Sequence, residues 1–120
     1  MIAVIQGVKR TSGTVATQVI APINRELVIL LGVAQGDTDQ NVSFMVEKIP
    51  RFQIFPDTQG EMTDALPDIN GELLLISQFT LLANTKKGRR PSVELAAPPE
   101  EARLRYRETL EQLRALGLSV

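Results

Sequence analysis

A continuous apolar run, "ELVILLGVA" at residues 26–34, constrains the fold more than any other stretch of this chain. The run has the length of a β-strand and is rich in aliphatic and β-branched residues, without alternation of polar and apolar positions. Such a pattern is typical of a strand that is covered on both faces. We therefore expect residues 26–34 to lie inside a sheet with a layer on each side.

Further strands are predicted around this run. Residues 14–20 alternate in pattern, and the turn signal "RTSG" before them predicts a hairpin with a strand at residues 1–9. A short strand is expected at residues 52–55, ahead of the turn "PDTQG". The turn signal "DING" precedes "LLLISQFTLL", residues 73–82, which we expect to be the central strand.

Two segments predict helices. Residues 38–49 carry apolar side chains at helical spacing, with Asp37 or Thr38 as the capping residue. Residues 98–117 begin with prolines and glutamates, which favour a helix N-terminus, and end at a glycine. The expected buried stripe of this second helix consists of Tyr106, Leu110 and Leu113.

The order of these elements is strands, helix, strands, helix. It predicts an α+β domain in which two helices pack on a mostly antiparallel sheet. The length of 120 residues and the hydrophobic content of 43% suit one domain with a single core, spanning residues 1–120.

Missing residue types exclude several kinds of chemistry. The chain has no cysteine and no histidine, which excludes thiolate metal sites and catalytic arrangements built on cysteine or imidazole. Its carboxylates lie around turns without metal-binding spacing, so we expect neither a metal nor another cofactor. A net charge of −1 and an aromatic content of 4% lead us to expect no DNA partner. No apolar run approaches the roughly 20 residues of a membrane span, and we expect a cytoplasmic protein without a membrane partner.

Polar residues interrupt the run at residues 73–82. Ser77, Gln78 and Thr80 stand where a buried strand would have to satisfy every polar group. In one interpretation the end of the strand is partly solvated, and Ser77 bonds to neighbouring backbone. In the other, the end of the strand forms the floor of a ligand pocket. The spacing leaves both open.

A cluster of cations follows this run. It consists of Lys86, Lys87, Arg89 and Arg90. Such a cluster in a loop is either a solvated surface or a contact for phosphate groups, because guanidinium forks and ammonium groups both suit phosphates. The second interpretation would place a phosphate-bearing substrate near the end of the strand.

Ordered matches along the whole chain identify a family. The segments "MIAVIQ", "ELVILLGV", "IFPDTQGEM", "GELLLISQFTL" and "KKGRRPS" follow one another as in the D-aminoacyl-tRNA deacylases, which this sequence resembles. The resemblance implies a barrel-like fold, a homodimer with each active site near the dimer interface, and hydrolysis of the ester between a D-amino acid and tRNA. It also implies that Ser77, Gln78, Phe79 and Thr80 line the pocket for the terminal adenosine and the aminoacyl group. Met62 and the four cations are the further expected substrate contacts.

Thr80 matches a threonine that was once proposed as the nucleophile of this family. A threonine hydroxyl is a weak nucleophile without an adjacent base, and this chain has no histidine to supply one. We therefore expect the pocket to orient the ester while the terminal 2′-OH of the RNA assists the reaction.

Several positions depart from the family pattern. Gly7 stands where the family has an arginine, Thr63 replaces an asparagine, and no Gly-Pro dipeptide occurs, although the family uses one to reject L-amino acids. These differences predict either an impaired deacylase or a non-catalytic tRNA-binding paralogue. Because the family also continues with further strands, we expect a sheet edge or an apolar sheet face to be left open here.

Overall fold

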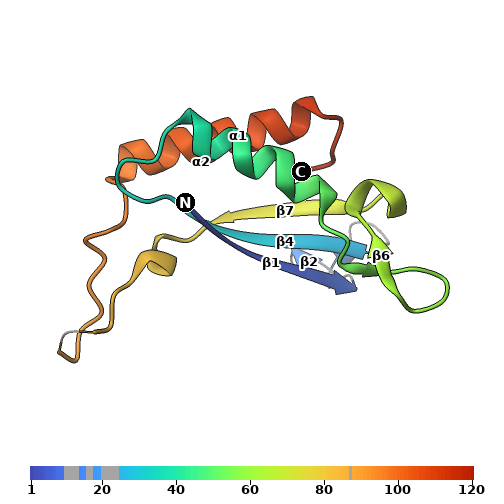
Figure 1. The fold of residues 1–120 in the computed structure, drawn as a ribbon, viewed down its shortest axis with the longest axis horizontal. Coiled ribbons are helices and arrows are strands. Elements are labelled where there is room, and N and C mark those ends of the chain that lie inside the picture. Colours follow the sequence, from blue (N-terminus) through green and yellow to red (C-terminus); the bar gives the residue numbers. More distant parts are fainter. Residues whose placement is uncertain (10–13, 16–17, 20–24, 87) are drawn as a thin grey trace.

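The computed structural model of the chain describes residues 1–9, 14–15, 18–19, 25–86 and 88–120. It is an α+β domain in which two helices lie on one side of a sheet (Figure 1). The strands are β1 (Ile2–Lys9), β2 (Thr14–Val15), β3 (Gln18–Val19), β4 (Arg25–Gly32), β5 (Phe55–Pro56), β6 (Met62–Asp64) and β7 (Glu72–Ser77). The α-helices are α1 (Asp39–Lys48) and α2 (Pro99–Ala115), and the 3₁₀ helices are η1 (Ile49–Arg51), η2 (Leu66–Ile69) and η3 (Phe79–Leu82).

The main sheet is mixed, with the strand order β1-β4-β7. β4 pairs with β1 in antiparallel and with β7 in parallel orientation. The prediction of a mostly antiparallel sheet was therefore wrong. The reason is the long connection between β4 and β7, which contains α1. It returns the chain to the end of the sheet at which β4 begins, so that β7 runs in the same direction as β4. The described residues form no closed barrel either.

Two predictions about strand neighbours also need correction. β4, not the segment that contains β7, is the central strand, and β7 lies at an edge. The expected hairpin of residues 1–9 with 14–20 is replaced by pairing of β1 with β4, while β2 pairs with β3. The turn at residues 10–13 lies outside the described part of the chain.

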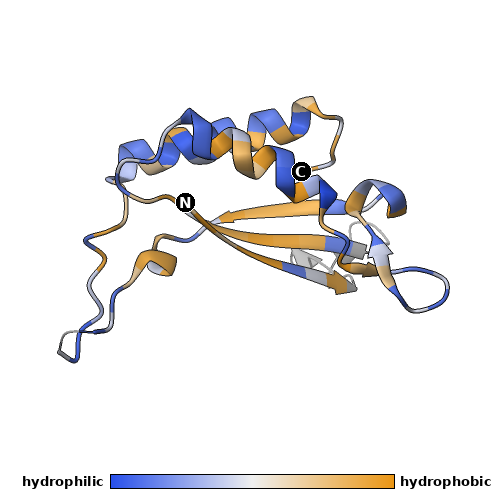
Figure 2. Ribbon diagram, in the orientation of Figure 1, coloured by the Kyte–Doolittle hydropathy of each residue, from blue (hydrophilic) through white to orange (hydrophobic). Residues whose placement is uncertain are grey.

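The core lies between the sheet and the two helices. Alternate residues of β4 point toward the helices and are fully buried, namely Leu27, Ile29 and Leu31. Leu73 and Leu75 of β7 lie on the same face, together with buried side chains of both helices. Figure 2 shows that the three strands are mostly apolar, with polar residues toward the end of the sheet near β6, whereas the helices alternate between apolar and polar residues.

The opposite face of this sheet is apolar and exposed. Ile2 and Leu74 are 42% and 50% exposed, in contrast to 0% for Leu27 on the covered face. Val4 and Ile76 are exposed as well, and they flank Leu30 in one row across the three strands. Coverage of β4 on both faces was thus predicted wrongly for this chain. The predicted open apolar face is confirmed.

Both predicted helices are confirmed, close to the expected bounds. Thr38 caps α1, since its hydroxyl accepts a hydrogen bond from the N–H of Gln40 at 3.3 Å. α2 ends before Gly117, which adopts a positive φ of 88°. The predicted stripe of α2 packs on the core, and it also includes Thr109, whose buried hydroxyl donates to the carbonyl of Arg105 at 2.8 Å. Neither helix is long and apolar enough to cross a bilayer in the described part of the chain.

Candidate active site

The site begins where β7 ends. Ser77 forms the last pair with β4, opposite Leu31, and the N–H of Gln78 donates to the carbonyl of Leu31 at 2.8 Å. The chain then turns into η3 and leaves the sheet. The predicted strand at residues 73–82 therefore extends too far, because β7 ends at Ser77. Phe79 and Thr80 lie in η3, so their side chains do not alternate between the two faces of the sheet as they would in a strand.

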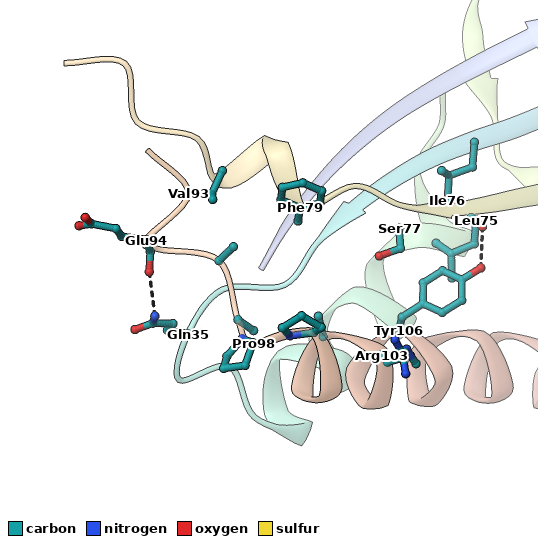
Figure 3. A pocket seen from close by; sticks show the side chains of 14 residues that line it. Gln35, Leu75, Ile76, Ser77, Phe79, Val93, Glu94, Pro98, Arg103 and Tyr106 are labelled. Atoms are coloured by element: carbon teal, nitrogen blue, oxygen red, sulfur yellow. Dashed lines mark hydrogen bonds between the residues drawn. The ribbon is translucent and has the colours of Figure 1, made fainter. Parts of the chain in front are cut away.

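A pocket of about 920 Å³ lies between the end of β7, the start of α2 and the segment that leads into α2. Figure 3 shows the side chain of Ser77 pointing from β7 toward α2, with Phe79 at the edge of the same space. The lining is mostly apolar. It comprises Gln35, Leu75, Ile76, Ser77, Phe79, Val93, Glu94, Ala96, Ala97, Pro98, Pro99, Ala102, Arg103 and Tyr106.

Hydrogen bonds between distant segments hold the walls of this pocket. The N–H of Gln35 donates to the carbonyl of Leu95 at 2.9 Å, and the N–H of Ala97 donates to the carbonyl of Val33 at 2.8 Å. On the other side, the hydroxyl of Tyr106 donates to the carbonyl of Leu75 at 2.8 Å, which ties α2 to β7. The pocket is thus preformed by backbone pairing, as expected of a small-molecule site.

The polar groups at the floor of the pocket are available to a ligand. Ser77 and Phe79 line the pocket, whereas Gln78 and Thr80 do not. No hydrogen bond among the described residues uses the Ser77 hydroxyl or the backbone N–H groups of Phe79 and Thr80. The amide of Gln78 donates to the hydroxyl of Thr80, and Thr80 itself is exposed. The end of the strand is solvated, as the first interpretation holds, because Ser77 and Thr80 are exposed, but no bond of the Ser77 hydroxyl to neighbouring backbone occurs among the described residues.

The basic cluster lies on a loop that extends away from the domain (Figure 1). Two backbone hydrogen bonds between Asn84 and Ser92, of 2.6 and 2.8 Å, close the base of the loop. Lys86, Arg89 and Arg90 are exposed on it and form no ion pair with any described residue. Lys87 lies outside the described residues.

Met62 is not brought to this pocket within one chain. It lies on β6, beside the start of β7, whereas the pocket is at the end of β7 (Figure 1). The neighbouring turn is organised by the carboxylate of Asp57, whose pKa is lowered by hydrogen bonds from the Thr63 hydroxyl at 2.8 Å and from the backbone N–H groups of Gln59 and Glu61. Met62 is 59% exposed at this turn.

Most residues that line the pocket were not predicted from the sequence. Arg103, Glu94 and Gln35 line it, yet they stand in segments without any recognisable motif. The available signal was helical spacing, because Pro99, Ala102, Arg103 and Tyr106 recur on one side of α2. No group of three acidic side chains suited to a metal ion occurs among the residues described.

The chain is thus a small α+β domain with a pocket at the carboxyl end of a sheet strand. Residues 4–120 match the family model described as D-Tyr-tRNA(Tyr) deacylase, and the chain belongs to this family. The resemblance seen in the sequence is thereby confirmed.

Individual relatives agree with this assignment. A D-aminoacyl-tRNA deacylase of Sulfurihydrogenibium sp. (strain YO3AOP1) is 48% identical over 112 residues, which are 93% of this chain and 76% of the relative. One of Desulfitobacterium hafniense (strain DSM 10664 / DCB-2) is 40% identical over the whole chain and 80% of the relative.

Solved structures share the fold. A structure titled "c-Myc DNA Unwinding Element Binding Protein" superposes with a TM-score of 0.80 at 39% identity, over 95% of this chain and 76% of that one. A structure titled as a probable eukaryotic D-amino acid tRNA deacylase gives a TM-score of 0.63 at 15% identity, over 78% of this chain and 55% of that one, and it supports the fold alone.

Proposed function

We propose that this protein hydrolyses the ester bond of D-aminoacyl-tRNA and releases the free D-amino acid and tRNA. The observation that carries the proposal is the preformed pocket at the end of β7, with unpaired polar groups at its floor, in a chain of the deacylase family. The terminal adenosine and the aminoacyl group occupy this pocket, where apolar walls fit the base and Phe79 offers an exposed ring.

The chemistry that we propose uses positioning and not a side-chain nucleophile. The N–H groups of Phe79 and Thr80 donate to the carbonyl oxygen of the ester, where negative charge develops during attack. The terminal 2′-OH of the RNA, next to the ester, positions the attacking water. Ser77 and Gln78 hold the substrate in this orientation, with no metal or other cofactor.

The basic loop contributes affinity in this proposal. Lys86, Arg89 and Arg90 are exposed and form no ion pair within the described part of the chain, which leaves their charges available for tRNA phosphates. The same role is proposed for Lys87, on the sequence alone.

We propose further that the protein works in the cytoplasm as a homodimer. The exposed apolar face of the sheet supports self-association, because monomers rarely leave such a face uncovered. A second copy would also explain the expected role of Met62, which lies at the far end of β7 in its own chain.

A second candidate function is a non-catalytic tRNA-binding protein on the same scaffold. Gly7 favours it, because the ring of Phe55 fills the space beside this glycine and no side chain is present where the family has an arginine. One assay separates the two functions, namely hydrolysis of D- and L-aminoacyl-tRNA by the 120-residue chain. Hydrolysis of the D-form supports the enzyme, and hydrolysis of both forms supports an enzyme without chiral selection. Retained tRNA binding without any hydrolysis would favour the binding protein.

A further inference from the structure

We infer that Gly32 is a positioning residue of the deacylase site, because only a residue without a side chain lets η3 lie against the end of β4. This inference rests on the proposed function for its effect on activity, although not for its effect on structure. Gly32 is the last residue of β4 and is not one of the residues that line the pocket.

The space beside Gly32 is already occupied by the turn that carries the site. A Cβ atom at this position would lie 2.8 Å from Cδ2 of Leu82, 3.1 Å from the carbonyl oxygen of Gln78 and 3.1 Å from Cβ of Leu81. The first neighbour is the end of a side chain and can rotate. The other two are the carbonyl oxygen of Gln78 and the Cβ of Leu81, so the turn itself would have to yield by a few tenths of an ångström.

Conformational freedom does not explain this glycine. The positive-φ residues of the described chain do not include Gly32, which has ordinary strand geometry. A side chain would therefore be compatible with the backbone of β4, and only the approach of η3 excludes it.

The displaced segment is the one that faces the substrate. The N–H of Gln78 is anchored by its hydrogen bond to the carbonyl of Leu31, the residue before Gly32. A Cβ at position 32 that displaces the carbonyl oxygen of Gln78 would therefore rotate the following peptide groups about this anchor. These peptide groups carry the N–H groups of Phe79 and Thr80. A misplacement of about 1 Å in a catalytic geometry costs about a hundredfold in rate, so a displacement of a few tenths of an ångström is expected to cost less, about tenfold.

A second glycine in the same sheet serves as a control. Gly7 also lies in a strand with ordinary geometry, and a Cβ there would lie 3.2 Å from Cε1 of Phe55. Its neighbours are in the region of β5, far from η3 (Figure 1). Gly7→Ala therefore introduces milder crowding into the same sheet, with one tight contact instead of three, and its neighbours are not part of the turn at residues 78–82.

The test compares these two variants by thermal melting, by steady-state hydrolysis of D-tyrosyl-tRNA, and by the ¹H–¹⁵N resonances of Phe79 and Thr80. We expect both variants to melt below the wild type. Only Gly32→Ala should lose kcat/KM, by about tenfold or more, mainly through kcat. It should also shift the two amide resonances, which Gly7→Ala should leave in place.

Equal losses of kcat/KM in the two variants, measured where both are folded, would overturn the inference, and so would unshifted resonances in Gly32→Ala. If the wild type hydrolyses no aminoacyl-tRNA, the proposed function fails, whereas the resonances still test whether Gly32 positions the turn. If Gly32→Ala does not fold, Gly32→Ala/Leu82→Val relieves the 2.8 Å approach and replaces it in the same comparison.

Discussion

At the scale of single residues, the hydroxyl of Thr80 accepts a hydrogen bond from an amide and forms none with a carboxylate among the described residues. The Gln78 amide donates to this hydroxyl, and an amide group cannot accept its proton during an attack. Thr80→Ala should therefore lower kcat by no more than about tenfold, because one hydrogen bond contributes about 0.5–1.5 kcal/mol. Loss of a true nucleophile costs on the order of a millionfold.

Single-turnover hydrolysis of D-aminoacyl-tRNA measures the effect of Thr80→Ala, with Thr80→Ser as the control that keeps the hydroxyl. A loss of several orders of magnitude in Thr80→Ala, restored in Thr80→Ser, would make Thr80 the nucleophile after all.

The Thr63 hydroxyl is the largest cause of the lowered pKa of Asp57. The departure from the family asparagine thus has a structural role in this turn. Thr63→Ala should raise the pKa of Asp57 toward its ordinary value, and Thr63→Ser should keep it low. NMR titration of the Asp57 carboxyl carbon measures both variants.

The sign of the pH dependence follows from the direction of this shift. Because folding lowers the pKa of Asp57, its contribution to stability is present above the unfolded pKa and is lost as the pH falls through the folded pKa. An Asp57 pKa that is the same in Thr63→Ala and in the wild type would contradict this role for the hydroxyl.

At the scale of elements, the basic loop is the part of the site that binding experiments can test separately. Arg89→Glu/Arg90→Glu should weaken tRNA binding and reduce the slope of log K against log salt by roughly 0.7–0.9 for each phosphate that the loop no longer neutralises. Arg51→Glu/Arg107→Glu, at two exposed positions outside the loop, is the charge-matched control. Binding isotherms at several salt concentrations, with a DNA duplex as a second ligand, provide the measurement. An unchanged slope would remove the loop from the interface.

Elements defined by local chemistry were predictable, whereas their pairing was not. The Thr38 cap and the Gly117 stop specify α1 and α2 within a few residues, and the apolar runs identify β1, β4 and β7. Whether β7 lies parallel or antiparallel to β4 depends on the path of the connecting chain, which no local pattern encodes.

The candidate site shows the same division. The end of β7 could be found from polar residues in an apolar run, but the residues that form its opposite wall come from another part of the chain. Arg103 and Glu94 line the same pocket as Ser77 only because backbone bonds join residues 33–35 to residues 95–97. The turn at Phe79 depends on the missing side chain of Gly32, which lies far from it in sequence.

At the scale of the whole molecule, the uncovered face of the sheet should dominate the solution behaviour. Val4, Leu30 and Ile76 form one apolar row on this face, and Leu74 is half exposed beside it. Burial of this surface is favourable by roughly 25 cal/mol per Å² of apolar area, and this contribution favours association with a second copy of the chain. We therefore expect concentration-dependent self-association of the wild type.

Val4→Lys/Leu74→Lys should reduce this self-association. A lysine on this face is exposed to solvent, so each substitution should lower the free energy of unfolding by about 1 kcal/mol. A charge among the buried residues of the other face would instead prevent folding. Leu104→Lys, at an exposed apolar position of α2, is the control and should leave association unchanged. Sedimentation velocity over a range of concentrations, with thermal melting of each variant, provides the measurement. A wild-type chain that stays monomeric at every concentration and melts cooperatively would contradict the expectation, because the apolar face would then be stable in water without a partner.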